Sequence, residues 1–582
     1  MRPVTAASGG GFLFSAVSPA DVFAPEDFSS EHTLAARTLR EFLEAEVDPR
    51  TADLESHNYP LVRALLRRLG ELGFLGVDIP EAYGGCGLDL ITSLLVAEHM
   101  SRGSFSVSFG AHTVIGTLPI VYFGTEAQKR RYLPGLASGE IVGAYALTEP
   151  TAGSDALAAR TRAVLSEDGS QYLLTGTKQF VTNAGLADVF VTYAKVDGEH
   201  FTCFIMDRRT DGLTVGAEEH KMGIKGSSTA SLFLDDARVP AAHVLGEIGR
   251  GHRVALNVLN IGRLKLGTAC LGAAKRALRQ AAAYAGERHQ FGRPIASFGL
   301  IRQKLAEMAV RIYLLESLVY RTGGLIQSAR RSPDDVVASL EEYAIECSVA
   351  KVYGSETVGL AADELVQIYG GYGFIEDYPA ARAYRDARIN RIYEGTNEIN
   401  RLLIPGMLLR RAKRGRLPLS DAIQHAREAI LGADLGASDG GPLAEEHQQV
   451  ELAKKAALLA AGAAVERFGD GIQDHQEILV RIADLVIEIF ALESGLLRAL
   501  RAQERSQALD VKVDIARVAA HDGLGRIDTL CRQILAAAVE GETLRTLLAA
   551  QRRFLRYVPV DTIRLRRHVA ERVLEAGGYA AW

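Results

Sequence analysis

The spacing of the hydrophobic positions changes along the chain and divides it into four regions. In residues 1–144 apolar side chains recur at intervals of three and four, as at Val62, Leu65 and Leu69, which predicts amphipathic helices. Residues 145–247 instead hold short β-branched and aromatic runs, such as DVFVTYAKV and FTCFIMDR, broken by Gly, Asp and Asn. Such runs predict a domain of β-strands in the middle of the chain.

The last two regions return to helical spacing. Residues 248–412 contain long Ala- and Leu-rich runs, including GRLKLGTACLGAAKRALRQAAAYAGERH, and residues 425–582 follow the loop LGADLGASDGGP. In the fourth region one helical face carries a stripe of apolar residues, namely Ile478, Ile482, Leu485, Ile489 and Leu492. The predicted fold class is therefore α+β and multidomain, with an N-terminal helical domain, a central β-domain, a second helical domain and an additional helical domain.

Composition excludes several classes of protein. The chain has 582 residues, 48% of them hydrophobic and 24% charged, and a formal net charge of −5, so it is globular and has no global basic field for nucleic acid. Its five cysteines are far apart and form no CxxC pair, which argues against a disulfide framework or a zinc site and fits a reducing compartment. No metal site is predicted.

Several sequence signals are missing. The N-terminus lacks the pattern of a signal or transit peptide, and no window approaches the apolar run of a membrane span, so we expect a cytoplasmic protein, at most peripheral at the inner face of a membrane. No GxGxxG opens a helix after a strand, which argues against a Rossmann-bound dinucleotide. HExxH, P-loop and GxSxG motifs are absent as well.

The segment RIYEGTNEINR, residues 391–401, carries the sharpest chemical pattern. Gly395 lets backbone and ligand come close to Glu394, and Thr396 is suited to cap a following helix. Flanked by Ile392 and Tyr393, the carboxylate of Glu394 is a candidate general base, because poor solvation raises a carboxyl pKa. The alternative from these residues alone is a solvated glutamate in a turn.

Each of three further segments, taken alone, allows two interpretations. YALTEPTAGSD, residues 145–155, predicts a strand and a turn that leaves hydroxyl and N–H donors free for a cofactor, or only a common turn. ERHQFGRPI, residues 287–295, places two arginines where they either clamp a phosphate or complement a helix dipole. QIYGGYGF, residues 367–374, either admits a close ligand or merely turns.

Together, in this order and spacing, these segments resemble the acyl-CoA dehydrogenases over residues 30–412. KMGIKGSSTA, residues 221–230, agrees with that family's β-domain. The GGGFLF stretch and the fourth region look most like the very-long-chain branch, whose members carry an additional C-terminal helical domain. The resemblance implies a central β-barrel, a four-helix C-terminal domain, and FAD bound between these two and across a homodimer interface.

The resemblance also assigns roles to individual residues. Glu394 matches the base that removes the α-proton. The positions implied for FAD are Tyr145, Leu147, Thr148, Gly153, Ser154, Phe180, Val181, Thr182, Arg288, Phe291, Gln367, Ile368, Gly370, Gly371, Thr396, Asn397 and Glu398. Those implied for acyl-CoA are Ser154, Asn260, Ile261, Gly262, Arg263 and Gly395. Gly262 stands where a minority of the family carries its base, and Phe180 stands where many carry Trp.

The implied activity is oxidation of a long- or very-long-chain acyl-CoA to its trans-2-enoyl form, with hydride transfer to flavin N5 and electron-transfer flavoprotein as acceptor. The alternatives are an acyl-CoA oxidase and a relative that binds DNA. The fourth region is expected to cover the apolar face through which shorter members form tetramers, which would leave a homodimer. Basic clusters in residues 410–416 and 552–568 favour either an anionic membrane surface or ordinary salt bridges.

Overall fold

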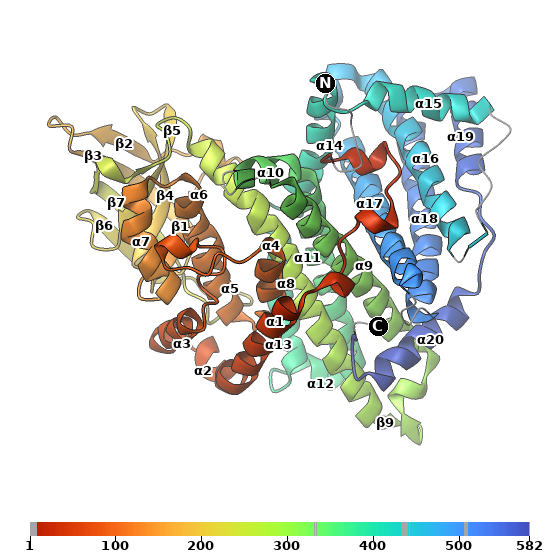
Figure 1. Ribbon diagram of the computed structural model, residues 1–582, viewed down its shortest axis with the longest axis horizontal. Helices are drawn as coiled ribbons and strands as arrows, with labels where there is room; N and C mark the ends of the chain where they lie inside the picture. Colours follow the sequence, from red (N-terminus) through yellow and green to blue (C-terminus); the bar gives the residue numbers. More distant parts are fainter. Residues whose placement is uncertain are drawn as a thin grey trace.

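The computed structural model describes residues 8–330, 332, 335–431, 440–441, 443–505 and 510–580. The N-terminal region consists of short helices beside the sheet domain (Figure 1). They are α1 (Ser30–Phe42), α2 (Thr51–Glu55), α3 (Tyr59–Glu71), α4 (Leu90–His99), α5 (Ser104–Gly110), α6 (Leu118–Phe123) and α7 (Glu126–Ser138). The predicted stripe Val62, Leu65 and Leu69 is buried in α3.

One helical run of the N-terminal region is unusually apolar. The helical run Ser104–Phe123 is long and apolar enough, by length and composition alone, to cross a membrane, so the expectation that no window approaches a membrane span was wrong. The run is 72% buried inside the protein, and Phe105 and Phe109 pack in the core of the N-terminal region. It therefore serves here as a core segment.

The middle region is one eight-stranded sheet. Its strands are β1 (Gly143–Ala146), β2 (Arg162–Leu165), β3 (Gln171–Thr182), β4 (Val189–Val196), β5 (His200–Asp207), β6 (Leu213–Glu218), β7 (Thr229–Pro240) and β8 (Val244–Leu245). The order is β6-β7-β3-β2-β4-β5-β8, with β1 beside β4. β1 and β2 run parallel to β4, and the other neighbours are antiparallel. Side chains of six strands meet in one core that includes Ala144, Ala163, Leu174, Phe190, Phe204 and Leu232.

Long helices form the second helical domain. They are α8 (Gly251–Glu287), α9 (Gly299–Ala329), α10 (Val336–Glu342), α11 (Ala344–Tyr369), α12 (Gly371–Phe374), α13 (Pro379–Arg388) and α14 (Asn397–Lys413), and the hairpin β9 (His289–Gln290) and β10 (Arg293–Pro294) follows α8. α8 and α11 approach closely because Gly267 and Gly354 face each other; a Cβ added at Gly354 would lie 2.8 Å from the Gly267 Cα. This close contact fixes α8 against α11.

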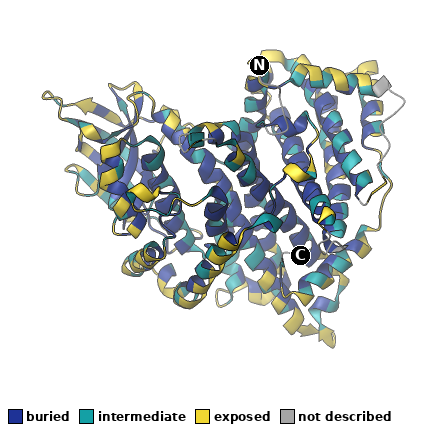
Figure 2. Cartoon of the chain, viewed as in Figure 1, coloured by how far each residue is buried: buried dark blue, intermediate teal, exposed yellow. Residues whose placement is uncertain are grey.

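The fourth region packs against this domain from within the same chain. Its helices are α15 (Leu419–Leu431), α16 (Ala444–Phe468), α17 (Gln476–Glu504), α18 (Asp510–Ala538), α19 (Gly541–Phe554) and α20 (Thr562–Glu575). The whole predicted stripe from Ile478 to Leu492 is buried, and α17 contacts α9 and α14 on one side and α16 and α18 on the other. Figure 2 shows the resulting continuous buried interior. The preceding loop lies largely outside the described residues.

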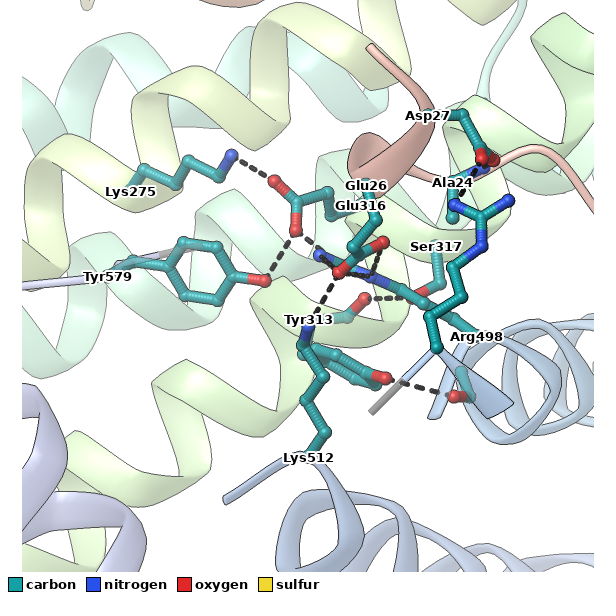
Figure 3. Close-up of polar contacts among 12 residues, drawn as sticks. Ala24, Glu26, Asp27, Lys275, Tyr313, Glu316, Ser317, Arg498, Lys512 and Tyr579 are labelled. Atoms are coloured by element: carbon teal, nitrogen blue, oxygen red, sulfur yellow. Dashed lines mark hydrogen bonds and ion pairs between the residues drawn. The ribbon is translucent and has the colours of Figure 1, made fainter. Parts of the chain in front are cut away.

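A buried ionic network joins the fourth region to the rest of the chain (Figure 3). Arg498 of α17 donates to Glu316 of α9 at 2.6 Å and to Glu26 near the N-terminus at 3.0 Å. Lys512 of α18 lies 2.8 Å from Glu26, and the Tyr579 hydroxyl donates to Glu316 at 2.5 Å. Removing one partner would leave a buried charge uncompensated, so the network ties both ends of the chain to α9 and α17.

The fold confirms the predicted fold class, since the helical, sheet, helical and additional helical regions follow in that order.

The contact between α17 and α9 is close enough to affect the stability of the fold. A Cβ added at Gly495 would lie 2.4 Å from a methyl carbon of Leu314, and the Tyr313 hydroxyl donates to the Gly495 carbonyl at 3.1 Å. The close contact between α17 and α9 therefore requires a glycine at this position.

Gly495→Val should lower the free energy of unfolding by about 1–3 kcal/mol, the usual cost of overpacking. The control is Gly525→Ala in α18, where an added Cβ meets no atom within 4 Å and alanine favours the helix. Urea unfolding followed by circular dichroism measures both. Equal midpoints for the two variants would contradict this account of the contact.

Candidate active site

Glu394 lies in the turn between the 3-10 helix Ile389–Arg391 and α14, and the turn aims its side chain at α8. Glu394 and Gly395 have φ angles of 57° and 76°, so two successive residues are left-handed, a conformation that non-glycine residues rarely adopt. Thr396 then caps α14 as predicted, its hydroxyl oxygen accepting from the Ile399 N–H at 3.2 Å. The strained turn is thus held by a helix cap.

The carboxylate of Glu394 packs directly against Gly262 of α8. A Cβ at Gly262 would lie 2.6 Å from Glu394 Oε2, so α8 has no room for a larger residue there. The Oε2 atom is buried, with no hydrogen-bond partner in the described chain, and the part of the side chain that stays accessible lines a cavity. Burial raises the pKa of Glu394 to about 7, although Arg263 and Lys351 oppose the shift.

Three side chains hold the backbone of this turn. Lys351 of α11 donates to the Gly395 carbonyl at 2.8 Å, as does Asn400 of α14, while Arg263 donates to the Glu394 carbonyl at 3.3 Å. Burial lowers the pKa of Lys351 to about 8. The sequence analysis missed Lys351 and Asn400. The signal for Lys351 was a lysine on the apolar helical run CSVAKVYG.

A tunnel begins at Glu394 and follows α8. Its cavity, of about 280 Å³, is lined on one side by a continuous face of that helix. The residues of that face are Gly262, Lys265, Leu266, Ala269, Cys270, Ala273, Arg276, Ala277 and Gln280. α8 rises about 1.5 Å per residue, so this wall is about 27 Å long. The opposite wall includes Val96, Met100, Val107 and Phe109 of the N-terminal region.

The first group of predicted flavin residues lies on the sheet domain. Phe180 is 58% exposed with a φ angle of 56°, at a register shift of β3 against β7. Val181 is buried, and Thr182 lines the tunnel. Gly153 has open space where a Cβ would stand, and Ser154 is exposed. An exposed aromatic ring beside an open turn with free hydroxyl groups fits a flat cofactor that carries a pyrophosphate.

A buried ion pair stabilises the turn that carries Gly153 and Ser154. Lys178 of β3 lies 2.7 Å from Glu149, and both side chains are buried. Glu149 also accepts from the Arg160 N–H at 2.6 Å, and the Gln179 N–H donates to the Thr148 carbonyl at 2.8 Å. Tyr145 is buried within β1 and Leu147 is half-buried. The pair was not predicted, although Glu149 belongs to the segment 145–155 that the sequence analysis singled out.

The second group of predicted flavin residues lies at the other end of α8. Arg288 and Phe291 are exposed, Phe291 to 91%, and they lie beside the end of α11, where the guanidinium of Arg288 is 5.6 Å from the Tyr372 ring centroid. Gln367, Gly370 and Gly371 are exposed there as well, and Ile368 is buried. With about 1.5 Å per residue, Arg288 lies about 39 Å along the helix from Gly262. The structure therefore does not bring the two groups together in one chain.

The remaining predicted residues take structural or peripheral positions. Asn397 is buried, and its amide group is hydrogen-bonded to Lys351, Ser355 and Glu356. Glu398 is exposed at the start of α14. Asn260 accepts from Arg263 at 3.0 Å, and Ile261 packs in the helical core. No group of three metal-ligating side chains occurs in the part of the chain that the structure describes.

Comparisons with known proteins identify the family of the chain. Residues 29–140, 144–237 and 249–409 match the N-terminal, middle and C-terminal domains of acyl-CoA dehydrogenase, and residues 452–553 match a further C-terminal domain of that name. A "Probable acyl-CoA dehydrogenase" of Bacillus subtilis is 48% identical over 583 residues, 98% of each chain.

Human very long-chain specific acyl-CoA dehydrogenase is 36% identical over 79% of this chain and 75% of its own length. The structure of a Bacillus anthracis acyl-CoA dehydrogenase complexed with FAD superposes with a TM-score of 0.97 at 47% identity, covering 99% of this chain and all of the other. The chain therefore belongs to the acyl-CoA dehydrogenase family and is an FAD-dependent oxidoreductase acting on CH–CH bonds.

Proposed function

We propose that this enzyme converts long-chain saturated acyl-CoA thioesters to trans-2-enoyl-CoA in β-oxidation, with Glu394 as the base. The observation that carries the proposal is a poorly solvated carboxylate at the start of an apolar tunnel. Glu394 takes the α-proton, a C=C double bond forms, and the β-hydrogen leaves with its electron pair. Bound FAD supplies the acceptor for that hydride at N5.

The chain's own residues supply position and charge. The Glu394 N–H donates to no backbone group of the described chain, so it is free to bind the thioester oxygen, where negative charge develops as the α-proton leaves. Lys351, Asn400 and Arg263 hold the turn that aims both this N–H and the carboxylate. The tunnel walls exclude water from the reacting carbons.

The length of the tunnel supports a long acyl chain. The hydrocarbon core of a bilayer is about 30 Å thick, so one lipid acyl chain spans about 15 Å of it. The α8 wall of the tunnel is longer, at about 27 Å, and its alanine residues leave room beside the helix. A long chain is the substrate that fills such a tunnel.

The arrangement of the flavin residues supports a homodimer. One chain holds Phe180 near the tunnel and Phe291 at the far end of α8, too far apart for one cofactor. A second copy, related by two-fold symmetry, would bring its Arg288 and Phe291 to the first copy's FAD. The reduced flavin would then pass electrons to electron-transfer flavoprotein. An oxidase remains the second candidate, and turnover with dioxygen as the sole acceptor identifies it.

Glu394→Gln should slow flavin bleaching by hexadecanoyl-CoA at least 100-fold, because the amide keeps the shape but cannot accept the α-proton. Anaerobic stopped-flow spectroscopy measures the rate. Glu376→Gln, which changes an exposed carboxylate paired with Arg385, is the control and should keep the rate. A Glu394→Gln rate within tenfold of the wild type would refute the assignment.

The pH dependence of bleaching should report the same carboxyl. The base works deprotonated, so the rate should rise with pH through a midpoint near 7, the pKa that burial gives Glu394. Lys351→Met removes a cation that lowers this pKa, so the midpoint should move upward, whereas Lys351→Arg keeps the charge and should restore it. An unshifted midpoint in Lys351→Met would show that Lys351 does not tune the base.

Light scattering should give a molar mass equal to two copies of the chain. Phe291→Asp places a charge on the surface proposed to meet the second copy, so it should yield monomers that lose FAD on dialysis. Val558→Asp, at a residue that is 71% exposed elsewhere, is the control. A monomeric wild-type protein that retains FAD would contradict the shared site.

A further inference from the structure

The acyl tunnel ends at charged groups rather than in an apolar cap. At the far end of its α8 wall the lining residues are Arg276 and Gln280, and Asp48, Arg102 and Arg382 line the same end from three other segments. Between this end and Glu394 the walls are mostly apolar, with Leu266, Ala269 and Ala273 on α8. A fatty acyl chain that fills the tunnel therefore brings its terminal carbon to a group of guanidinium ions.

The guanidinium ions have too few anionic partners. Asp48 Oδ1 lies 2.6 Å from Arg102 Nε and 3.7 Å from Arg276 Nη1, so one carboxylate serves two arginines. Neither of these two nitrogens makes a hydrogen bond of good geometry within the described chain, and both atoms are buried. Among the described residues, Asp48 is thus the one ion-pair partner of Arg276, and it lies near the greatest distance at which an ion pair forms.

Most of the charged groups that act on Arg276 are positive. Burial and the neighbouring charges of Arg102, Arg279 and Arg382 together lower the pKa of Arg276 to about 10, although Asp48 opposes the shift. Two other carboxylates line this end of the tunnel, Glu55 and Asp386. Both accept from backbone amides, Glu55 from Gly226 at 3.3 Å and Asp386 from Ile224. These carboxylates therefore already have partners in the sheet domain.

A terminal methyl group is a poor neighbour for such a site, because it displaces water from partly buried guanidinium groups and offers no hydrogen bond in return. A terminal carboxylate would accept charge-assisted hydrogen bonds in a paired geometry that arginine favours. We propose that the far end of the tunnel, formed by Arg102, Arg276 and Arg382, binds the ω-carboxylate of long-chain dicarboxylic acyl-CoA monothioesters. This inference rests on the proposed function, since the acyl chain must enter at Glu394.

The distances suit a long chain. Arg276 lies about 21 Å along α8 from Gly262 at about 1.5 Å per residue. The Arg276 side chain occupies part of this distance. The distance that is left for the acyl chain is comparable to the roughly 15 Å that one lipid chain spans in a bilayer leaflet. A dicarboxylic chain of ordinary fatty-acid length therefore reaches Arg276 with its distal carboxylate, and a short one does not.

The test compares kcat/KM for the monothioester of hexadecanedioic acid with that for hexadecanoyl-CoA. The wild-type enzyme should favour the dicarboxylic substrate. Arg276→Met should lower the ratio of the two values by about 10- to 100-fold, the effect of losing one hydrogen bond to a charged group. Arg276→Lys should keep most of the preference, because it keeps the charge. Arg253→Met, at an exposed arginine of α8 about 35 Å along the helix from Arg276 and outside the tunnel lining, is the matched control and should leave the ratio unchanged.

The possible outcomes separate the two proposals. If the wild-type enzyme oxidises neither substrate, the proposed function itself fails. If it oxidises hexadecanoyl-CoA but does not favour the dicarboxylic substrate, or if Arg276→Met and Arg253→Met change the ratio equally, only the ω-carboxylate site is overturned. The monothioester of octanedioic acid extends the test, because its carboxylate falls short of Arg276. A loss of rate in Arg276→Met as large for this substrate as for the long one would also refute the site.

Discussion

The site depends on holding one carboxylate out of water without a hydrogen-bond partner. Glu394 packs against Gly262, and its Oε2 atom has no hydrogen-bond partner among the described residues, so the surrounding fold must offset the cost of desolvation. The left-handed backbone at Glu394, the Thr396 cap and the hydrogen bonds from Lys351 and Asn400 all serve this purpose. Their result is a carboxyl whose pKa, about 7, suits the proton abstraction that we propose for it near neutral pH.

In the proposed function, α8 links the carboxylate of Glu394 to the selection of the substrate. The same helical face that meets the carboxylate at Gly262 continues past small residues to Arg276 and Gln280. The helix is rigid because glycines let it pack closely on α11 and because Lys275 joins the buried network with Glu316. The fourth region, through Arg498 and Lys512, completes this network. A domain with no part in the chemistry thereby supports the wall of the tunnel.

Much of this could be predicted from the sequence. The periodicity at Val62 and from Ile478 to Leu492 identified buried helical faces, and Thr396 was correctly predicted as a cap. The Glu394 segment alone was ambiguous, because desolvation depends on Gly262, which is distant in the sequence. The partners Lys351 and Asn400 were missed since their role exists only after α11 and α14 pack together. The arginines at the tunnel's end come from separate segments, and spacing along the chain could not group them.

The most direct test of the central claim is the protonation of Glu394 in the resting enzyme. Infrared difference spectra between the wild type and Glu394→Gln, recorded across pH, isolate the carbonyl stretch of the protonated carboxyl. The account predicts that this band is present at pH 6 and disappears with a midpoint near 7. A carboxyl that is fully ionised at pH 6, as a solvated glutamate would be, would contradict it.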